Sequence, residues 1–382
     1  MGFGSKHRRK FKRAKYGRRS RRKSLMATNA GPWVAILGVV AGVGALACAV
    51  IFLLVPFIKG IYNFGGGQTT PTVIEGEPTP APTFRTIQTV ELGSLQKEII
   101  VQQKYLSHPW IYDSLLFYSA GTDSAGGPKM NNLYSYDMQS EGSARRLEIE
   151  LENDDFLYPR VNGSWMVFLD NNRSGGGKIK AMNRQSGELF TVKEYYSGQP
   201  VTSLWENYVV WTERTGTYRD KLFVYDLNTH ESVAVATFEN SVYGTSQASA
   251  GGGEIVWADG DASGEGTGSV ICSLKMDGSG GGIETYAPGM YVHDPVTNGS
   301  AWAWIDSNHE AGAKLYLSVA GGEPQVLAEN VLNYGISEEF VAYDKDGAIY
   351  VYFIEDGYEQ IITPAAERGW LACVANGMAL HG

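Results

Sequence analysis

A short pattern that recurs along most of the chain constrains its fold more than any other feature. In each copy, a turn often of Asn-Gly type leads into a segment rich in aromatic and β-branched residues, as at residues 161 to 170, 205 to 213 and 298 to 306. Successive copies are about 38 to 49 residues apart, which is the length of one four-stranded propeller blade. Alternating apolar and polar residues, with Gly, Asn, Asp and Ser clusters between them, are typical of strands joined by hairpins. The pattern therefore predicts an all-β propeller over residues 84 to 382.

The number of copies bears on how the ring closes. Six units at about residues 108 to 363 are complete, whereas residues 369 to 382 supply only two strands. Segments of strand character at residues 84 to 91 and 97 to 103 can complete that last unit, which leaves no unpaired edge. We therefore expect about seven four-stranded blades. The alternative is a six-bladed ring with the tail packed elsewhere, and the short last strand leaves open whether the C-terminus is complete.

The repeats resemble those of TolB-type β-propellers. The best copies of the TolB-type pattern are His-Asp-Pro-Val-Thr-Asn-Gly at residues 293 to 299 and Tyr-Pro-Arg-Val-Asn-Gly at residues 158 to 163. The Ser-Pro-Asp turn of that family is absent from every copy, so the resemblance is to the broad superfamily. The resemblance implies a propeller over residues 84 to 382. It predicts the architecture better than the activity, because this fold serves many functions. Together with the features below, it favours a bacterial protein.

The N-terminal part of the chain predicts a membrane anchor. Residues 34 to 58 carry no charge, and as a helix they span about 37 Å, more than the ~30 Å hydrocarbon core of a bilayer. Twelve of the 32 Lys and Arg residues lie between residues 6 and 23, where there is no acid, and such a block marks the cytoplasmic side. A retained signal anchor is favoured over a cleaved signal because the apolar run exceeds the usual 7–15 residues. The predicted domains are a basic cytoplasmic tail (1–32), a transmembrane helix (33–59), a stalk rich in Gly, Pro and Thr (60–83) and an extracellular propeller (84–382).

These features predict a single-pass protein of the plasma membrane with its N-terminus in the cytoplasm. The basic tail is also a candidate to bind anionic lipid. Nucleic acid is disfavoured as a partner, because the orientation of the membrane helix already requires such a basic block.

The search for chemistry identifies no catalytic residue and no cofactor. There is no G-x-S-x-G nucleophile motif, and no His has metal-ligand spacing to another His or Cys. The one candidate cation site is a possible calcium loop, in which oxygen ligands recur at alternate positions before a Gly. Its residues are Asp259, Asp261, Ser263 and Glu265. The alternative is an acidic turn in solvent.

The candidate ligand-binding pair is His293 and Asp294. These residues begin an inner strand, a position that lines the central channel in propellers, and the alternative is a hydrogen-bonded entry to that strand. Cys272 and Cys373 fall in blades that do not adjoin, so we expect them to be unpaired.

Four acids also recur at the ends of second strands, where we expect them to protect strand edges at loop mouths. They are Asp170, Glu213, Asp259 and Asp306.

The function predicted from these features is a binding, sensing or scaffolding module that presents its loops to a protein or polysaccharide of the cell envelope. One alternative is a glycan-active hydrolase or lyase with its site in the propeller funnel, which would need two carboxylates about 5 to 10 Å apart. Another is a scaffold subunit whose basic cytoplasmic tail binds lipid or nucleic acid and whose propeller docks a larger envelope assembly. Enzymatic activity is left open, and binding is favoured.

Overall fold

The computed structural model describes residues 103 to 381, apart from 126, 141–143, 218, 240–245, 261–267, 307–312, 368 and 376–377. Nearly all regular structure in this part is antiparallel sheet, with one short 3-10 helix, η1 (Ala365–Glu367). No helix of the described part is long and apolar enough to span a membrane. The predicted tail, transmembrane helix and stalk lie outside the described residues.

Six four-stranded sheets follow one another along the chain, and strands consecutive in sequence are neighbours in each sheet. Blade 1 contains β1 (Tyr105–Tyr112), β2 (Leu115–Thr122), β3 (Lys129–Asp137) and β4 (Arg145–Arg146). Blade 2 contains β5 (Asp155–Val161), β6 (Trp165–Asn171), β7 (Gly177–Asn183) and β8 (Leu189–Tyr195). Blade 3 contains β9 (Thr202–Trp205), β10 (Tyr208–Arg214), β11 (Arg219–Asp226) and β12 (Glu231–Glu239).

The second half of the propeller repeats this arrangement. Blade 4 contains β13 (Ser249–Gly251), β14 (Glu254–Gly260), β15 (Ser269–Lys275) and β16 (Glu284–Met290). Blade 5 contains β17 (Val292–Thr297), β18 (Ala301–Asp306), β19 (Lys314–Val319) and β20 (Gln325–Glu329). Blade 6 contains β21 (Val331–Ile336), β22 (Phe340–Lys345), β23 (Ala348–Phe353) and β24 (Tyr358–Thr363). A two-stranded sheet of β25 (Leu371–Ala375) and β26 (Met378–His381) follows.

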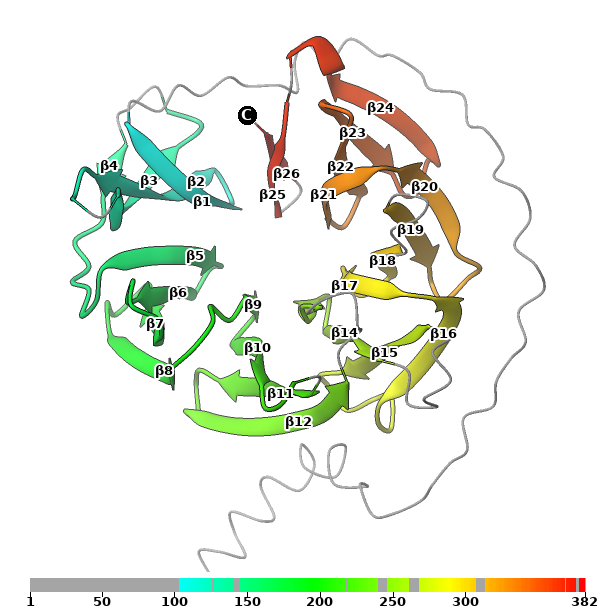
Figure 1. Cartoon of the computed structure of the whole chain (residues 1–382), viewed down its shortest axis with the longest axis horizontal. Coiled ribbons are helices and arrows are strands. Elements are labelled where there is room, and N and C mark those ends of the chain that lie inside the picture. Colours follow the sequence, from blue (N-terminus) through cyan, green and yellow to red (C-terminus); the bar gives the residue numbers. More distant parts are fainter. Residues whose placement is uncertain are drawn as a thin grey trace, which may run out of the picture. The chain divides into compact units, whose positions relative to one another are not determined.

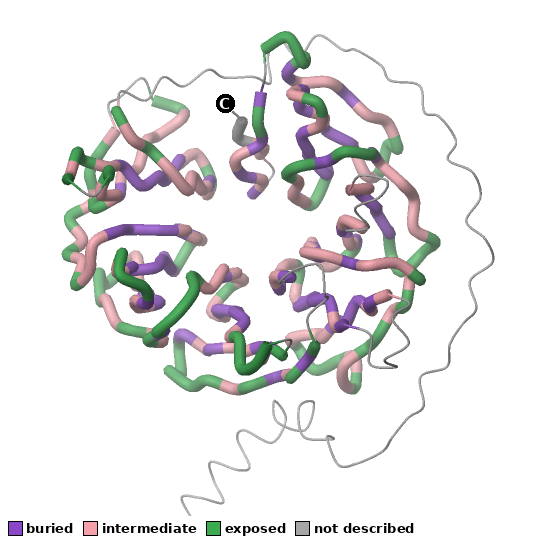
Figure 2. The backbone as a smooth tube through the Cα atoms, viewed as in Figure 1, coloured by how far each residue is buried: buried purple, intermediate pink, exposed green. Residues whose placement is uncertain are grey.

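The first strand of each sheet faces the centre of a ring (Figure 1). Each first strand contacts the first strand of the next blade, from β1 and β5 through to β17 and β21. The β25 strand contacts both β21 and β1, so the two-stranded sheet fills the space between blade 6 and blade 1. Buried residues lie mainly in the inner and middle strands of the blades, and exposed residues lie mainly at the outer rim (Figure 2).

The structure corrects the expected number of blades. It supports six four-stranded blades and not seven, because the seventh position holds only β25 and β26 among the described residues. The segments expected to complete that sheet, at residues 84 to 91 and 97 to 102, lie outside the described part. The all-β propeller is confirmed. In the six-bladed alternative, the C-terminal residues were expected to pack outside the ring. Instead, β25 packs between blade 6 and blade 1.

A cross-strand aromatic pair recurs in the blades and explains the sequence repeat. Four blades stack an aromatic ring of the second strand on the ring directly opposite it in the third strand. The pairs are Tyr118 with Tyr134, Trp211 with Phe223, Trp304 with Tyr316 and Tyr343 with Tyr350, with ring centroids 5.3–5.7 Å apart. Such pairs stabilise adjacent strands and fill the space between blades.

Blades 2 and 4 depart from this rule. In blade 4, Cys272 stands opposite Trp257, and in blade 2, Lys180 stands opposite Phe168. The Lys180 side chain is only 5% exposed, and its Nζ lies 2.6 Å from Glu152 Oε1 and 3.5 Å from Asp170 Oδ2. A buried ammonium group needs such partners. Blade 2 therefore carries a polar network in place of part of its aromatic core.

Asparagine side chains fasten neighbouring blades in two equivalent places. Asn162 accepts hydrogen bonds from two backbone N–H groups of its own turn, and its Nδ2 donates to the Glu206 carbonyl of blade 3 over 2.7 Å. Asn298 in blade 5 does the same and donates to the Ser337 carbonyl of blade 6 over 2.8 Å. The Asn-Gly turns of the repeat thus define the hairpin and also link it to the next blade.

The two cysteines of the described part are both buried and unpaired, as expected. Cys272 lies in β15 and Cys373 in β25. Burial raises the pKa of the Cys373 thiol to about 11, so it is neutral at physiological pH.

Candidate functional site

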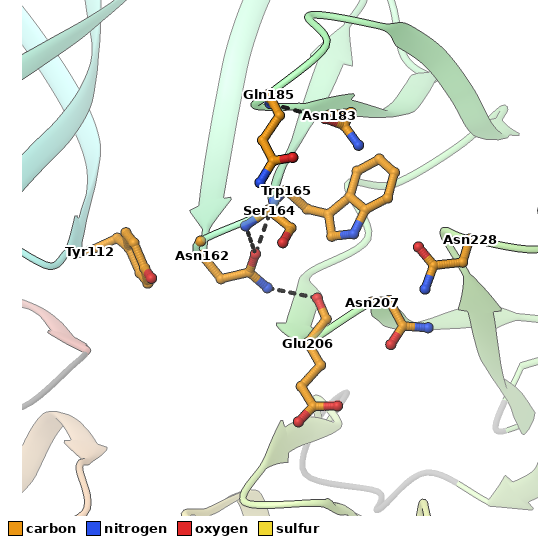
Figure 3. Close-up of a pocket in the computed structure, with 10 residues that line it drawn as sticks. Tyr112, Asn162, Ser164, Trp165, Asn183, Gln185, Glu206, Asn207 and Asn228 are labelled. Atoms are coloured by element: carbon orange, nitrogen blue, oxygen red, sulfur yellow. Dashed lines mark hydrogen bonds between the residues drawn. The ribbon is translucent and has the colours of Figure 1, made fainter.

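A depression of about 470 Å³ opens over blades 2 and 3, beside the end of β1 (Figure 3). Turns between first and second strands and turns between third and fourth strands meet at one face of a propeller, because successive strands alternate in direction. The depression is built from these turns in both blades. Its lining residues are Tyr112, Asn162, Gly163, Ser164, Trp165, Asn183, Gln185, Glu206, Asn207 and Asn228.

Two of the lining amides are held in place by the turns that they stabilise. Asn183 Oδ1 accepts hydrogen bonds from the N–H groups of Gln185 at 2.9 Å and Ser186 at 3.0 Å. Asn207 Nδ2 donates to Asp226 Oδ1 over 2.8 Å. The Asn207 amide also has a side-chain hydrogen bond with Tyr208. Asn183 Nδ2 has no hydrogen-bond partner in the described part of the chain, so of these two amides only Asn183 has a group left for a ligand.

Two further amides, those of Gln185 and Asn228, belong to exposed turn residues and make no side-chain hydrogen bond within the described part. The depression therefore offers both donors and acceptors that the fold does not use. Sequence reasoning missed these residues, because it did not consider what the turns of adjacent blades place side by side. The available signal was the Asn or Asp that ends the third strands of blades 2 and 3.

Aromatic groups border the same depression. Trp165 is 7% exposed and packs edge-on against Phe190, with ring centroids 6.0 Å apart. The Tyr112 ring lies at the blade 1 side (Figure 3), and the Arg184 guanidinium carbon is 5.3 Å from its centroid. Glu206 is the only charged residue of the lining.

The structure brings the predicted pair His293 and Asp294 together in β17. His293 Nδ1 lies 2.9 Å from Asp294 Oδ2, and this carboxylate raises the pKa of the imidazole. Asp294 Oδ1 accepts the N–H of Gln247 over 2.7 Å, and the Tyr334 hydroxyl donates to the Asp294 carbonyl. The pair thus joins blades 4, 5 and 6 around the inner strands. Its role in ligand binding stays a prediction.

Three inner strands contain the same kind of bulge, and the sequence analysis identified the motif at two of them. In β1, β5 and β17 the pairing register shifts around a residue that has positive φ and precedes a proline. These residues are His108, Tyr158 and Asp294, with φ of 51°, 50° and 47°. Proline lacks an N–H donor, so it suits a bulge on an inner edge strand. The sequence pattern was identified at the last two sites, and His108-Pro109 is the third.

At two of these bulges a small polar and aromatic cluster forms. The rings of His108 and Tyr158 lie 4.2 Å apart, and the Arg160 guanidinium carbon lies 4.4 Å from the Trp110 ring. Arg160 Nε donates to the Thr202 carbonyl over 3.2 Å. Burial, followed by the positive charge of Arg160, lowers the pKa of His108 to about 4.

This lowered pKa predicts a pH-dependent loss of stability. His108 is neutral in the folded chain, whereas in the unfolded chain it titrates near 6.5, so stability falls as pH drops from 6.5 towards 4. Asn tolerates positive φ but does not titrate. We therefore expect His108→Asn to reduce the loss of unfolding free energy at low pH by about 2 kcal/mol, a value that allows for partial solvent exposure. Urea unfolding of the full chain at pH 7 and pH 4.5 measures it. Equal losses in wild type and variant contradict the assignment.

Only one residue of the predicted calcium loop lies in the described part. Asp259 Oδ1 accepts the N–H of Glu239 over 2.8 Å, and burial raises the pKa of this carboxyl to about 6. Asp261, Ser263 and Glu265 lie outside the described residues. Among the described residues, no group of three or more His, Cys, Asp or Glu is arranged to hold a metal ion.

The recurring acids are not all exposed charges at loop mouths. Asp170 is fully buried, and its carboxylate accepts the N–H groups of Glu152 at 2.8 Å and Asn153 at 2.9 Å. Asp306 similarly accepts the N–H of Tyr291 at 3.3 Å. The expectation of edge protection is wrong for Asp170, because its carboxylate satisfies the backbone of the segment that enters the blade.

Solved structures of other proteins have a similar fold. No family model and no curated protein match the chain. The acylaminoacyl peptidase of Pyrococcus horikoshii is similar with a TM-score of 0.53 at 14% identity, over 72% of this chain and 48% of that one. The propeller domain of the Trilobed protease from Pyrococcus furiosus, described as having an open velcro topology, gives 0.53 at 14% identity over 70% and 87%. TolB from Acinetobacter baumannii gives 0.43 at 11% identity over 62% and 58%.

The chain shares the β-propeller fold with the two Pyrococcus structures. At such identities the similarity concerns the fold alone, and the chain spans less than half of the acylaminoacyl peptidase. The site of this propeller must therefore be argued from its own residues.

Proposed function

We propose that this chain is a membrane-anchored, extracytoplasmic binding module whose propeller presents the depression over blades 2 and 3 to a protein or polysaccharide of the cell envelope. The anchor and its orientation are supported by the uncharged run at residues 34 to 58 and the basic block before it. A β-propeller fold is compatible with such a module, because this fold serves many functions.

The observation that carries the proposal is a contrast between two sets of polar groups. The buried acids Asp155, Asp170 and Asp344 each accept backbone N–H groups and so hold the fold together. In the depression, by contrast, the amides of Gln185 and Asn228 make no side-chain hydrogen bond within the described part, and Asn183 uses only its Oδ1. A concave surface with a few fixed polar groups is the usual form of a binding site.

A glycan-active enzyme is favoured less by the same surface. Glycoside hydrolysis ordinarily needs two carboxyl groups on either side of the scissile bond. Glu206 is the only carboxylate that lines the depression.

The proposal is tested with the full chain carrying a tag after Gly382, produced in a bacterial host. We expect an antibody to label the tag once the outer layers of the envelope are removed and the plasma membrane is left intact. We also expect the solubilised, immobilised chain to retain envelope protein or polysaccharide that a tagged chain ending at residue 102 does not retain. A tag accessible only after the membrane is permeabilised, or no retention beyond that control, overturns the proposal.

A further inference from the structure

We propose that the depression over blades 2 and 3 binds a neutral carbohydrate. This inference rests on the proposed function and deepens it by naming the ligand class and the residues that recognise it. The occupant is a saccharide whose hydroxyl groups meet the amides of Asn183, Gln185 and Asn228.

The polar groups of the lining match sugar hydroxyls. Five of the ten lining residues have amide side chains, and an amide both donates and accepts hydrogen bonds, as a hydroxyl does. No Lys or Arg is among the lining residues, and the nearby Arg184 guanidinium is engaged by the Tyr112 ring and the Asn162 carbonyl. An anionic ligand would therefore lack a counter-charge in the lining itself. A single carboxylate, Glu206, is a weak basis for binding a cation.

The unused groups are held ready for a ligand. The two N–H groups that bind Asn183 Oδ1 hold that amide so that its Nδ2 is free to donate to a ligand. Asn207 is fixed by Asp226 and Tyr208 and forms part of the wall. One fixed donor therefore comes from blade 2, and the exposed amides of Gln185 and Asn228 come from the two neighbouring blades (Figure 3). Groups already ordered in the free protein lose less entropy on binding.

The shape and the aromatic residues also suit a sugar. A volume of about 470 Å³ falls within the range of small-molecule sites, roughly 300–1,000 Å³. The Trp165 indole lies between Asn162 and Asn228, and the Tyr112 ring stands at the opposite side (Figure 3). Trp165 is buried and forms the floor, whereas the half-buried Tyr112 ring presents apolar surface to the C–H groups of a saccharide. A peptide side chain is favoured less, because the lining has no apolar pocket to hold an anchoring residue.

The test uses the full chain in a detergent without a sugar head group, since a glycosidic detergent would compete for the site. Calorimetric titrations use cellotetraose, maltotetraose and chitotetraose as neutral probes and trigalacturonic acid as a charged probe. We expect at least one neutral probe to bind and the charged probe to bind at least tenfold more weakly.

Variants then locate the site. Gln185→Ala and Asn228→Ala remove exposed turn side chains, and each is expected to weaken binding about 3- to 10-fold, the effect of one hydrogen bond. Gln139→Ala is the matched control: its N–H donates to Asp137 Oδ1 at 2.9 Å in the blade 1 turn, as the N–H of Gln185 does to Asn183, but Gln139 does not line the depression. We expect it to bind as wild type does.

The outcomes separate this inference from the proposed function. If the immobilised chain retains envelope material but no neutral probe binds, or if Gln185→Ala and Asn228→Ala bind as well as wild type, the carbohydrate assignment is wrong and the binding module stands. If the charged probe binds best, the ligand class is wrong. If nothing is retained at all, the proposed function fails first. Equal thermal unfolding midpoints of the variants and wild type show that a loss of binding is local.

Discussion

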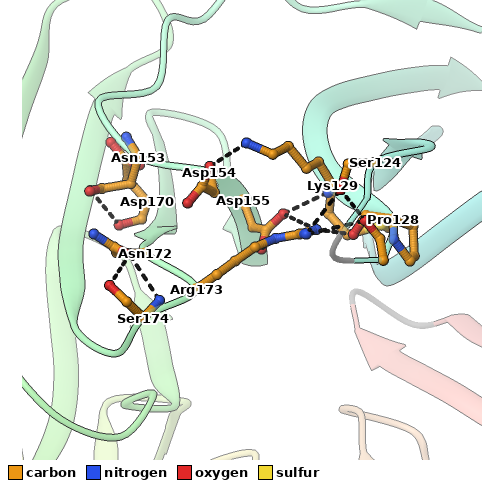
Figure 4. A network of polar contacts seen from close by, with 12 residues as sticks. Ser124, Pro128, Lys129, Asn153, Asp154, Asp155, Asp170, Asn172, Arg173 and Ser174 are labelled. Carbon is orange, nitrogen blue, oxygen red and sulfur yellow. Dashed lines mark hydrogen bonds and ion pairs between the residues drawn. The ribbon is translucent and has the colours of Figure 1, made fainter.

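Replacing Arg173 by Met is expected to lower the free energy of unfolding by about 3 kcal/mol, because it leaves a buried carboxylate without its counter-charge. Arg173 Nε lies 3.0 Å from Asp155 Oδ2, and the Asp155 side chain is only 10% exposed (Figure 4). The same guanidinium donates to the carbonyl groups of Gly127 and Pro128 in blade 1. The substitution therefore removes a link between blades 1 and 2. Urea unfolding of the full chain measures the change.

A matched control for this prediction is Lys104→Met. Lys104 pairs with Asp123 at 2.8 Å, but both side chains are largely exposed, at 65% and 69%. Exposed pairs contribute little because water solvates both charges. We expect no change beyond measurement error. A double-mutant cycle of Arg173→Met and Asp155→Ala should show a coupling energy, and additive effects would mean that the two side chains act separately.

Gly252→Ala is expected to destabilise the propeller by more than about 4 kcal/mol, an exceptional effect for one methyl group. Gly252 has φ of +55°, and a Cβ there would lie 2.0 Å from the Asn298 carbonyl oxygen of the next blade. The obstacle is backbone, so no side-chain rotation relieves it. The turn of blade 4 would have to move away from blade 5. Thermal and urea unfolding of the full chain give the measurement.

Gly187→Ala separates this packing effect from the cost of the backbone conformation. Gly187 also has positive φ, +75°, but a Cβ there would meet nothing within 4 Å. We expect a loss of about 1 kcal/mol from the left-handed conformation alone. If both variants lose the same stability, the close approach of blades 4 and 5 is not what requires a glycine at residue 252.

The amino-acid sequence by itself determined the local architecture of this protein. Strand alternation and turn residues act over short distances, so the blade period, the Asn-Gly turns and the all-β fold could be predicted from it. The unpaired state of Cys272 and Cys373 followed from the same blade count. The recurring aromatic residues marked the second and third strands, because their side chains pair directly across the hairpin.

Tertiary structure alone decided how the ring closes and where the polar groups lie. The number of complete blades depends on which distant segments pair with β25 and β26, and local patterns do not specify that pairing. The buried state of Asp170 depends on a loop that crosses it. The depression depends on the angle between blades 2 and 3, which brings Asn183 and Asn207 into one lining although the two belong to separate turns. Secondary structure is a short-range property of a chain, whereas a site built between blades exists only once they have packed.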